Sequence, residues 1–463
     1  METYVQQLLN VFKNTVLNAV GVERDFYRLL EDKDVTKAIE LMQNRSEDVD
    51  EAIKEYNPQT HRVMQRPNKR RKNNDPYITE KLPRTRQRYI NEVELFFLLG
   101  APLKYKKLDG DDDAYALFTD FIKDNRMDSI HREFKRLCGA ETEAAIVFHM
   151  YKDEDDIRCK PFIAARSTGY DIRPLFDQYG NMLAFAYGYT TRETSGNVKH
   201  WDILTPKINF ECTKGKMGWD IVPRENIVGK ICAIYGHQPK AWEGVEPRIH
   251  REEMMDSQIG DTNNYFADPV AFATADVVKM MGHEKEKIGR LLQFTGKDSQ
   301  FGYINPPNDS TSRMGEKQEL ARSILFDTFT PDFSYDSIKG MGSLSGEALE
   351  NAQILGFIKR ANRIEIYGEL FDREISVITA ILNVMHPNIM AGLRVDVEFQ
   401  SPFTKQNTQL WQNIANLYTV GVCSIETAVE LLALTDAPEE EIARIKQSAQ
   451  EAASLQAQAK GQE

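Results

Sequence analysis

Few residues of this chain have the types and spacing that enzyme chemistry needs. The stretch KGMGSLSG, residues 339–346, carries three glycines but matches neither GxGxxG nor GxxxxGK[ST], and its lysine precedes the glycines. Ser345 lacks the GxSxG frame of a nucleophile elbow. The stretch therefore does not indicate a phosphate cradle, and a nucleotide-dependent enzyme that uses it is only an alternative interpretation.

Metal ligands are equally scarce. None of the eight histidines lies in an HExxH motif, and the two nearest to acidic residues, His250 and His283, are expected on exposed charged segments. The five cysteines are far apart and form no CxxC pair, which favours reduced thiols in a cytosolic setting. We therefore expect no catalytic residue, no cofactor and no metal site.

One basic segment stands out from an acidic chain. The sequence QRPNKRRKNND contains Arg66, Lys69, Arg70, Arg71 and Lys72. It predicts a solvated arm, or else a contact with an anionic partner such as nucleic acid or an acidic neighbouring subunit. The whole chain has a net charge of -12, which argues against a protein that grips nucleic acid through released counterions.

No apolar run reaches the roughly 20 residues that a membrane span needs. The start METYVQQLLNVFKN has neither the charged beginning nor the apolar centre of a secretion signal. We expect a soluble product, made in the cytosol, with no membrane partner.

The element that dominates the sequence is a long amphipathic helix. No proline occurs between Ser345 and Met385, and apolar residues recur there at spacings of three and four. Ser345 is the predicted N-cap, followed by Gly346, and Leu349, Leu355 and Ile364 belong to the apolar face. Such a helix would be roughly 60 Å long, so neighbouring copies of the chain are expected to cover its apolar face.

A polar loop, residues 331–345, precedes this helix. Its composition predicts flexibility and contact rather than packing. The residues expected to make that contact are Asp336, Ser337, Lys339, Gly340, Gly342 and Ser343.

The remaining pattern predicts an α+β fold that is mainly helical with a β-rich middle. Residues 1–58 indicate helices, and a further helix should end at Gly100, two residues before a proline. Short β-branched and aromatic runs fill residues 143–235. Further predicted elements are a helix from Pro247, a mixed insert, a helix over 313–329, a strand in 393–403 and two helices in 405–434.

This order of elements resembles that of portal proteins of long-tailed bacteriophages. Residues 97–105 are similar to the family's LLGxPvxY, and residues 345–349 are similar to its SGxAL. The resemblance spans most of the chain and implies an elongated subunit built of wing, stem, clip and crown around the long helix. The implied parts are a wing of 1–238 with 346–402, stem helices in 239–261 and 311–329, a clip of 262–310, a channel loop of 330–345 and a crown of 403–463.

The resemblance also implies a function without catalysis. Such proteins form a twelve-subunit ring at one capsid vertex, the channel through which double-stranded DNA is packaged and ejected. The implied partners are the terminase large subunit, the head-tail connector or adaptor protein, and the major capsid and scaffolding proteins. The implied location is the virion, after assembly in the host cytoplasm. The main alternative is a DNA-binding scaffold or minor head protein that uses the basic arm 66–72.

Overall fold

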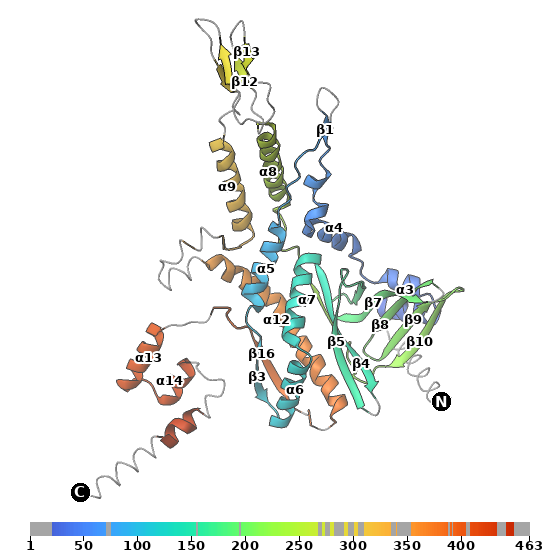
Figure 1. Cartoon of the computed structure of the whole chain (residues 1–463). Coiled ribbons are helices and arrows are strands. Elements are labelled where there is room, and N and C mark those ends of the chain that lie inside the picture. The colour runs from blue at the N-terminus through green and yellow to red at the C-terminus, as the bar shows by residue number, and fades with distance from the viewer. Residues whose placement is uncertain are drawn as a thin grey trace, which may run out of the picture. The chain divides into compact units, whose positions relative to one another are not determined.

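The computed structural model in Figure 1 has mixed helix and sheet, so the predicted α+β class is confirmed. The chain divides into two compact units, Met1–Pro402 and Phe403–Glu463. The structure describes residues 21–70, 76–153, 156–193, 196–266, 271–273, 278–281, 291–294, 301–303, 310–334, 339, 353–387, 389–390, 392–403, 408–432 and 441–448.

The β-rich middle of the first unit contains two antiparallel sheets. The larger sheet is a meander of β6 (Asp171–Phe176), β7 (Met182–Glu193), β8 (Gly196–Leu204), β9 (Ile208–Lys214) and β10 (Trp219–Glu225). The smaller sheet has β4 (Glu143–Asp153) at its centre, between β5 (Asp156–Ala164) and β11 (Ala233–His237). These strands confirm the β-rich segment predicted for residues 143–235.

Alternation along β7 puts its side chains into two different cores. Ala184 and Ala186 face α2 (Val22–Glu31) and α3 (Val35–Leu41), whereas Phe185 and Tyr187 face the smaller sheet. The opposite face of the smaller sheet packs on helices. The first unit is therefore layered, with helices on both outer sides of two stacked sheets.

The main core lies between the smaller sheet and the helices that cover its outer face. It combines apolar residues of α5 (Arg86–Leu99), α6 (Asp112–Asp124), α7 (Met127–Glu141) and α12 (Ile354–Met385). α5 ends at Gly100, as predicted, and the Arg132 guanidinium of α7 donates to the last carbonyl oxygens, Leu99 O and Gly100 O.

A two-stranded ribbon runs beside α12. β3 (Lys104–Asp109) pairs with β16 (Arg394–Glu398), which confirms the predicted half-buried strand. The register sets Lys104 against Glu398 and Lys106 against Asp396, so charges of opposite sign face each other across the exposed side.

Two helices form the part predicted as the stem. α8 (Glu246–Phe266) and α9 (Ser310–Asp327) lie side by side in Figure 1. α8 extends beyond residue 261, the boundary that the resemblance implied for this stem helix. The segment between them contributes β12 (Ala271–Ala273), β13 (Val278–Met281), β14 (Leu291–Phe294) and β15 (Phe301–Tyr303), paired as β12 with β15 and β13 with β14.

The long helix is shorter than predicted. α12 begins at Ile354 and has Gln353 at its N-cap position, and Ser345, the predicted N-cap, lies outside the described residues. Its 32 residues correspond to about 48 Å rather than 60 Å. Its first turn is occupied by contacts with α5, described below, which fix where it begins.

The N-terminal part also contains α4 (Ser46–Tyr56), two 3-10 turns (Pro58–Thr60 and Arg62–Gln65) and a short ribbon of β1 (Lys69–Arg70) with β2 (Pro76–Tyr77). The second unit contains α13 (Thr408–Thr419) and α14 (Ile425–Leu432), both predicted from the sequence, and a further helical stretch over 441–448.

Candidate functional site

The candidate site consists of the two short chain segments that flank residues 335–352 on either side. We name residues 330–334 and 353–357 the loop root. Both ends of the loop root contact one helix, α5, although they are separated by the intervening segment of the sequence. α5 therefore fixes where that segment leaves and re-enters the fold.

Tyr89 of α5 holds the first end. Its hydroxyl donates to Pro331 O at 2.7 Å and accepts from Phe333 N at 2.7 Å. One side chain thus replaces the backbone partners that this irregular stretch lacks. The phenol is half-buried, so these two hydrogen bonds are partly shielded from competing water.

Phe97, two helical turns further along α5, holds both ends together. Its ring stacks on Phe333, with 6.3 Å between the ring centroids, and meets Phe357 edge-on at 5.5 Å. It also lies directly over Gly356, where an added Cβ would come within 2.2 Å of the ring. Gly356 is therefore required for the close approach of Phe97 to the first turn of α12.

Between these two aromatic residues lies a buried carboxylate. Glu94 contacts Lys135 Nζ at 2.6 Å, Arg363 Nε at 3.0 Å and Lys359 Nζ at 3.3 Å. Gln238 Nε2 also donates to Glu94 Oε1 at 3.1 Å. Lys359 and Arg363 belong to α12, so Glu94 ties the start of that helix to α5 and α7.

In this cluster, the single carboxylate of Glu94 faces three basic side chains among the residues described. Burial raises the pKa of Glu94, but the coulombic effect of the three cations outweighs it and brings the pKa well below its usual range. The low pKa keeps the Glu94 carboxylate ionised at physiological pH. Burial lowers the pKa of Lys359 more than the charge of Glu94 raises it, and the resulting pKa is about 8.

A second charged network fixes α8. Its acidic residues Glu252, Glu253 and Asp256 are buried, with exposed fractions of 0%, 2% and 9%. Their partners come from the chain segment before α5 and from the first residue of α5: Arg86 contacts Glu252 at 2.8 Å, His61 contacts Glu253 at 2.6 Å, and Arg84 contacts Asp256. The sequence predicted that α8 would be an exposed charged helix. This prediction is wrong, because the chain segment that carries these partners covers the acidic side of α8.

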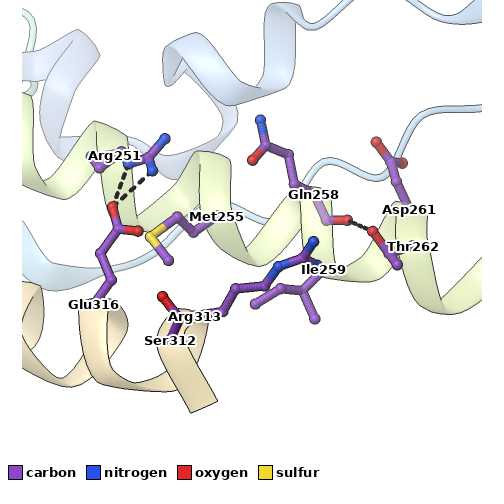
Figure 2. A pocket seen from close by; sticks show the side chains of 9 residues that line it. All are labelled: Arg251, Met255, Gln258, Ile259, Asp261, Thr262, Ser312, Arg313 and Glu316. Atoms are coloured by element: carbon purple, nitrogen blue, oxygen red, sulfur yellow. Dashed lines mark hydrogen bonds and ion pairs between the residues drawn. The ribbon is translucent and has the colours of Figure 1, made fainter. Parts of the chain in front are cut away.

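A groove of about 490 Å³ separates α8 from α9. Figure 2 shows Arg251 of α8 reaching across it to Glu316 of α9, and the ion pair measures 2.7 Å. Arg313 and Ile259 line its other end. The groove holds an ion pair that links the two helices.

The predicted loop residues fall mostly outside the described part of the chain. Those not described are Asp336, Ser337, Gly340, Gly342, Ser343, Ser345, Gly346 and Leu349. Lys339 is described and its side chain is exposed. Leu355 and Ile364 are half-buried, and Ile364 packs against the main core of its own chain.

Of the five basic-arm residues, Arg66 is the one whose side chain the structure describes, and it has a partner within the chain. Arg66 contacts Asp261 of α8 at 2.8 Å and donates to Glu80 O. Lys69 and Arg70 form β1, and Arg71 and Lys72 are outside the described residues. For Arg66, the anionic partner that the sequence suggested is thus α8 of the same subunit.

Sequence reasoning did not identify Tyr89, Glu94, Lys135, Lys359 or Arg363 as site residues. A signal was present, because Glu94 interrupts the apolar run of α5 and Lys359 lies on the buried side of α12. A lone charge on an apolar helix face predicts a buried partner elsewhere. Phe97 was noted only as part of a motif, and its contact with Gly356 gives that motif a physical reason.

Within the described ranges, no group of three or more His, Cys, Asp or Glu side chains could hold a metal ion. No helix described here combines the length and apolar character that crossing a bilayer requires. All five cysteines are free thiols.

Comparison with known proteins gives one match that covers nearly the whole chain. The family model described as "Phage portal protein, SPP1 Gp6-like" matches residues 35–455. A comparison with curated proteins finds no match.

Solved structures also show a distant likeness. One chain, from the neck of an empty GTA particle computed with C6 symmetry, is 10% identical with a TM-score of 0.45, covering 76% of this chain and 89% of that one. A second, from the neck of the native GTA particle computed with C12 symmetry, is 11% identical with a TM-score of 0.41, covering 76% and 91%. A third, from the virion of the native gene transfer agent particle, is 10% identical with a TM-score of 0.44, covering 76% and 92%.

Proposed function

Because the chain belongs to the phage portal protein family, we propose that copies of it close into a ring of twelve around a channel for double-stranded DNA. In this role the protein is a structural component of a phage particle. The observation that carries the proposal is the family match over residues 35–455, which includes α3 to α14, both sheets of the β-rich middle and the loop root.

The ring would stand at one vertex of the capsid. There it would admit DNA during packaging, release it during ejection, and dock the terminase and the head-tail connector proteins. The net charge of -12 is compatible with a conduit, because a strongly basic wall would bind phosphates and retain the DNA. No catalytic step is part of this proposal.

Negative-stain electron microscopy of the purified protein tests the ring directly. Rings with a central hole are expected, and the symmetry of class averages gives the number of subunits. A stable monomer at micromolar concentration, together with capsids that lack a ring at the vertex, would overturn the proposal.

Within the ring, residues 331–345 would face the DNA. Their polar composition and the double anchoring of the loop root on α5 support this assignment, since anchored ends position a contact segment without making it part of the core. A variant lacking residues 336–342 is expected to form rings but to fill capsids poorly. Normal packaging, or failure to form rings, would contradict this role.

Tyr89→Phe gives a finer test of the same assignment. It removes both hydrogen bonds to the loop root and keeps the ring of the side chain. We expect normal rings, faster amide hydrogen exchange over 331–334 and reduced packaging. Tyr179→Phe, at an 80% exposed hairpin tip, is the matched control and should match wild type in all three measurements.

A further inference from the structure

The outward face of α12 differs from its buried face in a way that the isolated subunit does not explain. We name as the α12 stripe six residues at spacings of three and four along the side that is not packed on the core. They are Ile354, Ile358, Ala361, Glu365, Gly368 and Asp372. Ile354 is 54% exposed and Ile358 is 41% exposed, so two large apolar side chains start the stripe in contact with water.

Gly368 is the most informative of the six residues of the α12 stripe. It lies in the interior of α12, where glycine is less favourable than alanine by about 1 kcal/mol. A Cβ added to it would meet nothing within 4 Å, so no neighbour within the subunit requires the missing side chain. Gly356, Gly260 and Gly139, which also lie within helices, each have a side chain in the way of such a Cβ.

The charges of the stripe are also unpartnered. Neither Glu365 nor Asp372 makes an ion pair with any residue that the structure describes. A surface that covered the stripe would therefore need an apolar group near Ile358 and a cation near Glu365. It would also need to approach the backbone closely at Gly368.

The same chain exposes such a surface on α9. Phe326 is 62% exposed, and Arg322, one helical turn away, is exposed without an ion pair to the described residues. The same side of α9 contains Gly315, the other helix-interior glycine whose Cβ would meet nothing within 4 Å. The cation and the aromatic ring of this face complement the carboxylates and isoleucines of the α12 stripe.

We propose that a second copy of this chain packs on the α12 stripe, with Gly368 at the point of closest approach and the Arg322–Phe326 face of α9 as the covering surface. The inference rests on the proposed ring, in which each copy has a neighbour on either side. The stripe runs from Ile354 to Asp372, a rise of about 27 Å along the helix, and would form one part of a larger contact.

The decisive comparison uses two bulky substitutions. Gly368→Trp places a large side chain on the stripe, and Met217→Trp places one at the fully exposed tip of the β9–β10 hairpin, away from α12. Both variants should keep the circular dichroism and thermal midpoint of the wild-type subunit. Ring yield should fall at least tenfold for Gly368→Trp alone, and equal yields for the two variants would overturn the proposal.

A labelling experiment tests the contact without obstructing it. The thiols of the variants E365C and M217C are alkylated with a maleimide in assembled rings and in dissociated subunits, and their peptides are quantified by mass spectrometry. We expect protection of the E365C thiol in rings only, and no protection of the M217C thiol. Equal labelling of the E365C thiol in both states would refute the contact while leaving the ring intact. A wild-type protein that formed no ring would instead refute the function on which the contact rests.

Discussion

The buried charge of Glu94 links three helices, α5, α7 and α12. Its side chain is 1% exposed and contacts three cations, two of them from α12. Glu94→Gln keeps the shape but removes the countercharge, and we expect a loss of about 3–5 kcal/mol in the free energy of unfolding. Urea denaturation of the isolated subunit measures this loss.

The matched control lies on the same helix. Glu92 pairs with Arg136 at 2.7 Å, but both side chains are about two-fifths exposed. Glu92→Gln should therefore change stability by no more than about 1 kcal/mol. Similar losses for the two variants would show that burial of the Glu94 cluster is not what makes it important.

His61 gives the fold a defined dependence on pH. Its Nδ1 lies 2.6 Å from Glu253 Oε1 and its Nε2 lies 2.7 Å from Glu55 O, so both nitrogens face acceptors. Burial lowers the pKa of His61, but the hydrogen bond and charge of Glu253 outweigh it and the pKa is raised. The resulting stabilisation is fully present below the unfolded pKa of about 6.5 and is lost as pH rises through the higher folded pKa.

The corresponding prediction compares thermal midpoints at pH 6 and pH 8. Wild type should lose more stability over this interval than His61→Gln, because the variant has no imidazolium to deprotonate. Arg84 N also donates to Glu253 Oε1, so the carboxylate keeps one partner in the variant. An identical pH dependence in both proteins would refute the assignment.

At the scale of elements, the two glycines of α12 provide an internal comparison. Gly356→Ala would drive a Cβ into the Phe97 ring and should destabilise the subunit by about 1–3 kcal/mol. Gly368→Ala meets open space and should stabilise the isolated subunit by up to about 1 kcal/mol, through helix propensity alone. Thermal unfolding of the two variants should shift in opposite directions, and a shift of the same sign in both would contradict the packing described here.

The sequence predicted elements well where local chemistry decides them. The end of α5 at Gly100 follows from the residue types at that position. Positions decided by distant contacts were missed. The start of α12 depends on Phe97 and Glu94, and the burial of Glu252 depends on Arg86, more than 160 residues earlier in the chain.

At the scale of the whole molecule, assembly and folding can be separated by two charged substitutions. Ile364→Asp introduces a charge beside the main core and should destabilise the subunit by about 3 kcal/mol. Leu355→Asp, also half-buried but within the loop root, should leave the subunit folded and reduce ring yield. Unfolding curves and particle counts distinguish the two effects, and an I364D subunit as stable as wild type would contradict the packing of Ile364.

The family could be recognised from the order of elements and two short motifs, because those features follow the chain locally. The residues at the loop root could not be assigned in the same way. Tyr89 and Phe333 are more than 240 positions apart, and nothing in either local sequence indicates that they meet. Ser345, the cap that the sequence predicted, lies outside the described residues, and α12 as described has Gln353 at its N-cap position.

The anchoring of both loop ends on α5 has a practical consequence for protein engineering. The contacts of the loop root with α5 fix the distance that residues 335–352 must bridge. We therefore expect a longer segment to cost only loop-closure entropy, about 0.6 kcal/mol of folding free energy for each doubling of its length. A Gly/Ser insert of about ten residues after Gly340 should therefore leave the subunit's free energy of unfolding within about 1 kcal/mol of wild type. The same insert within α5 should prevent folding. A site that accepts added length without loss of stability is suited to a fluorescent or affinity tag, and a large loss of stability there would show that the segment itself supports the fold.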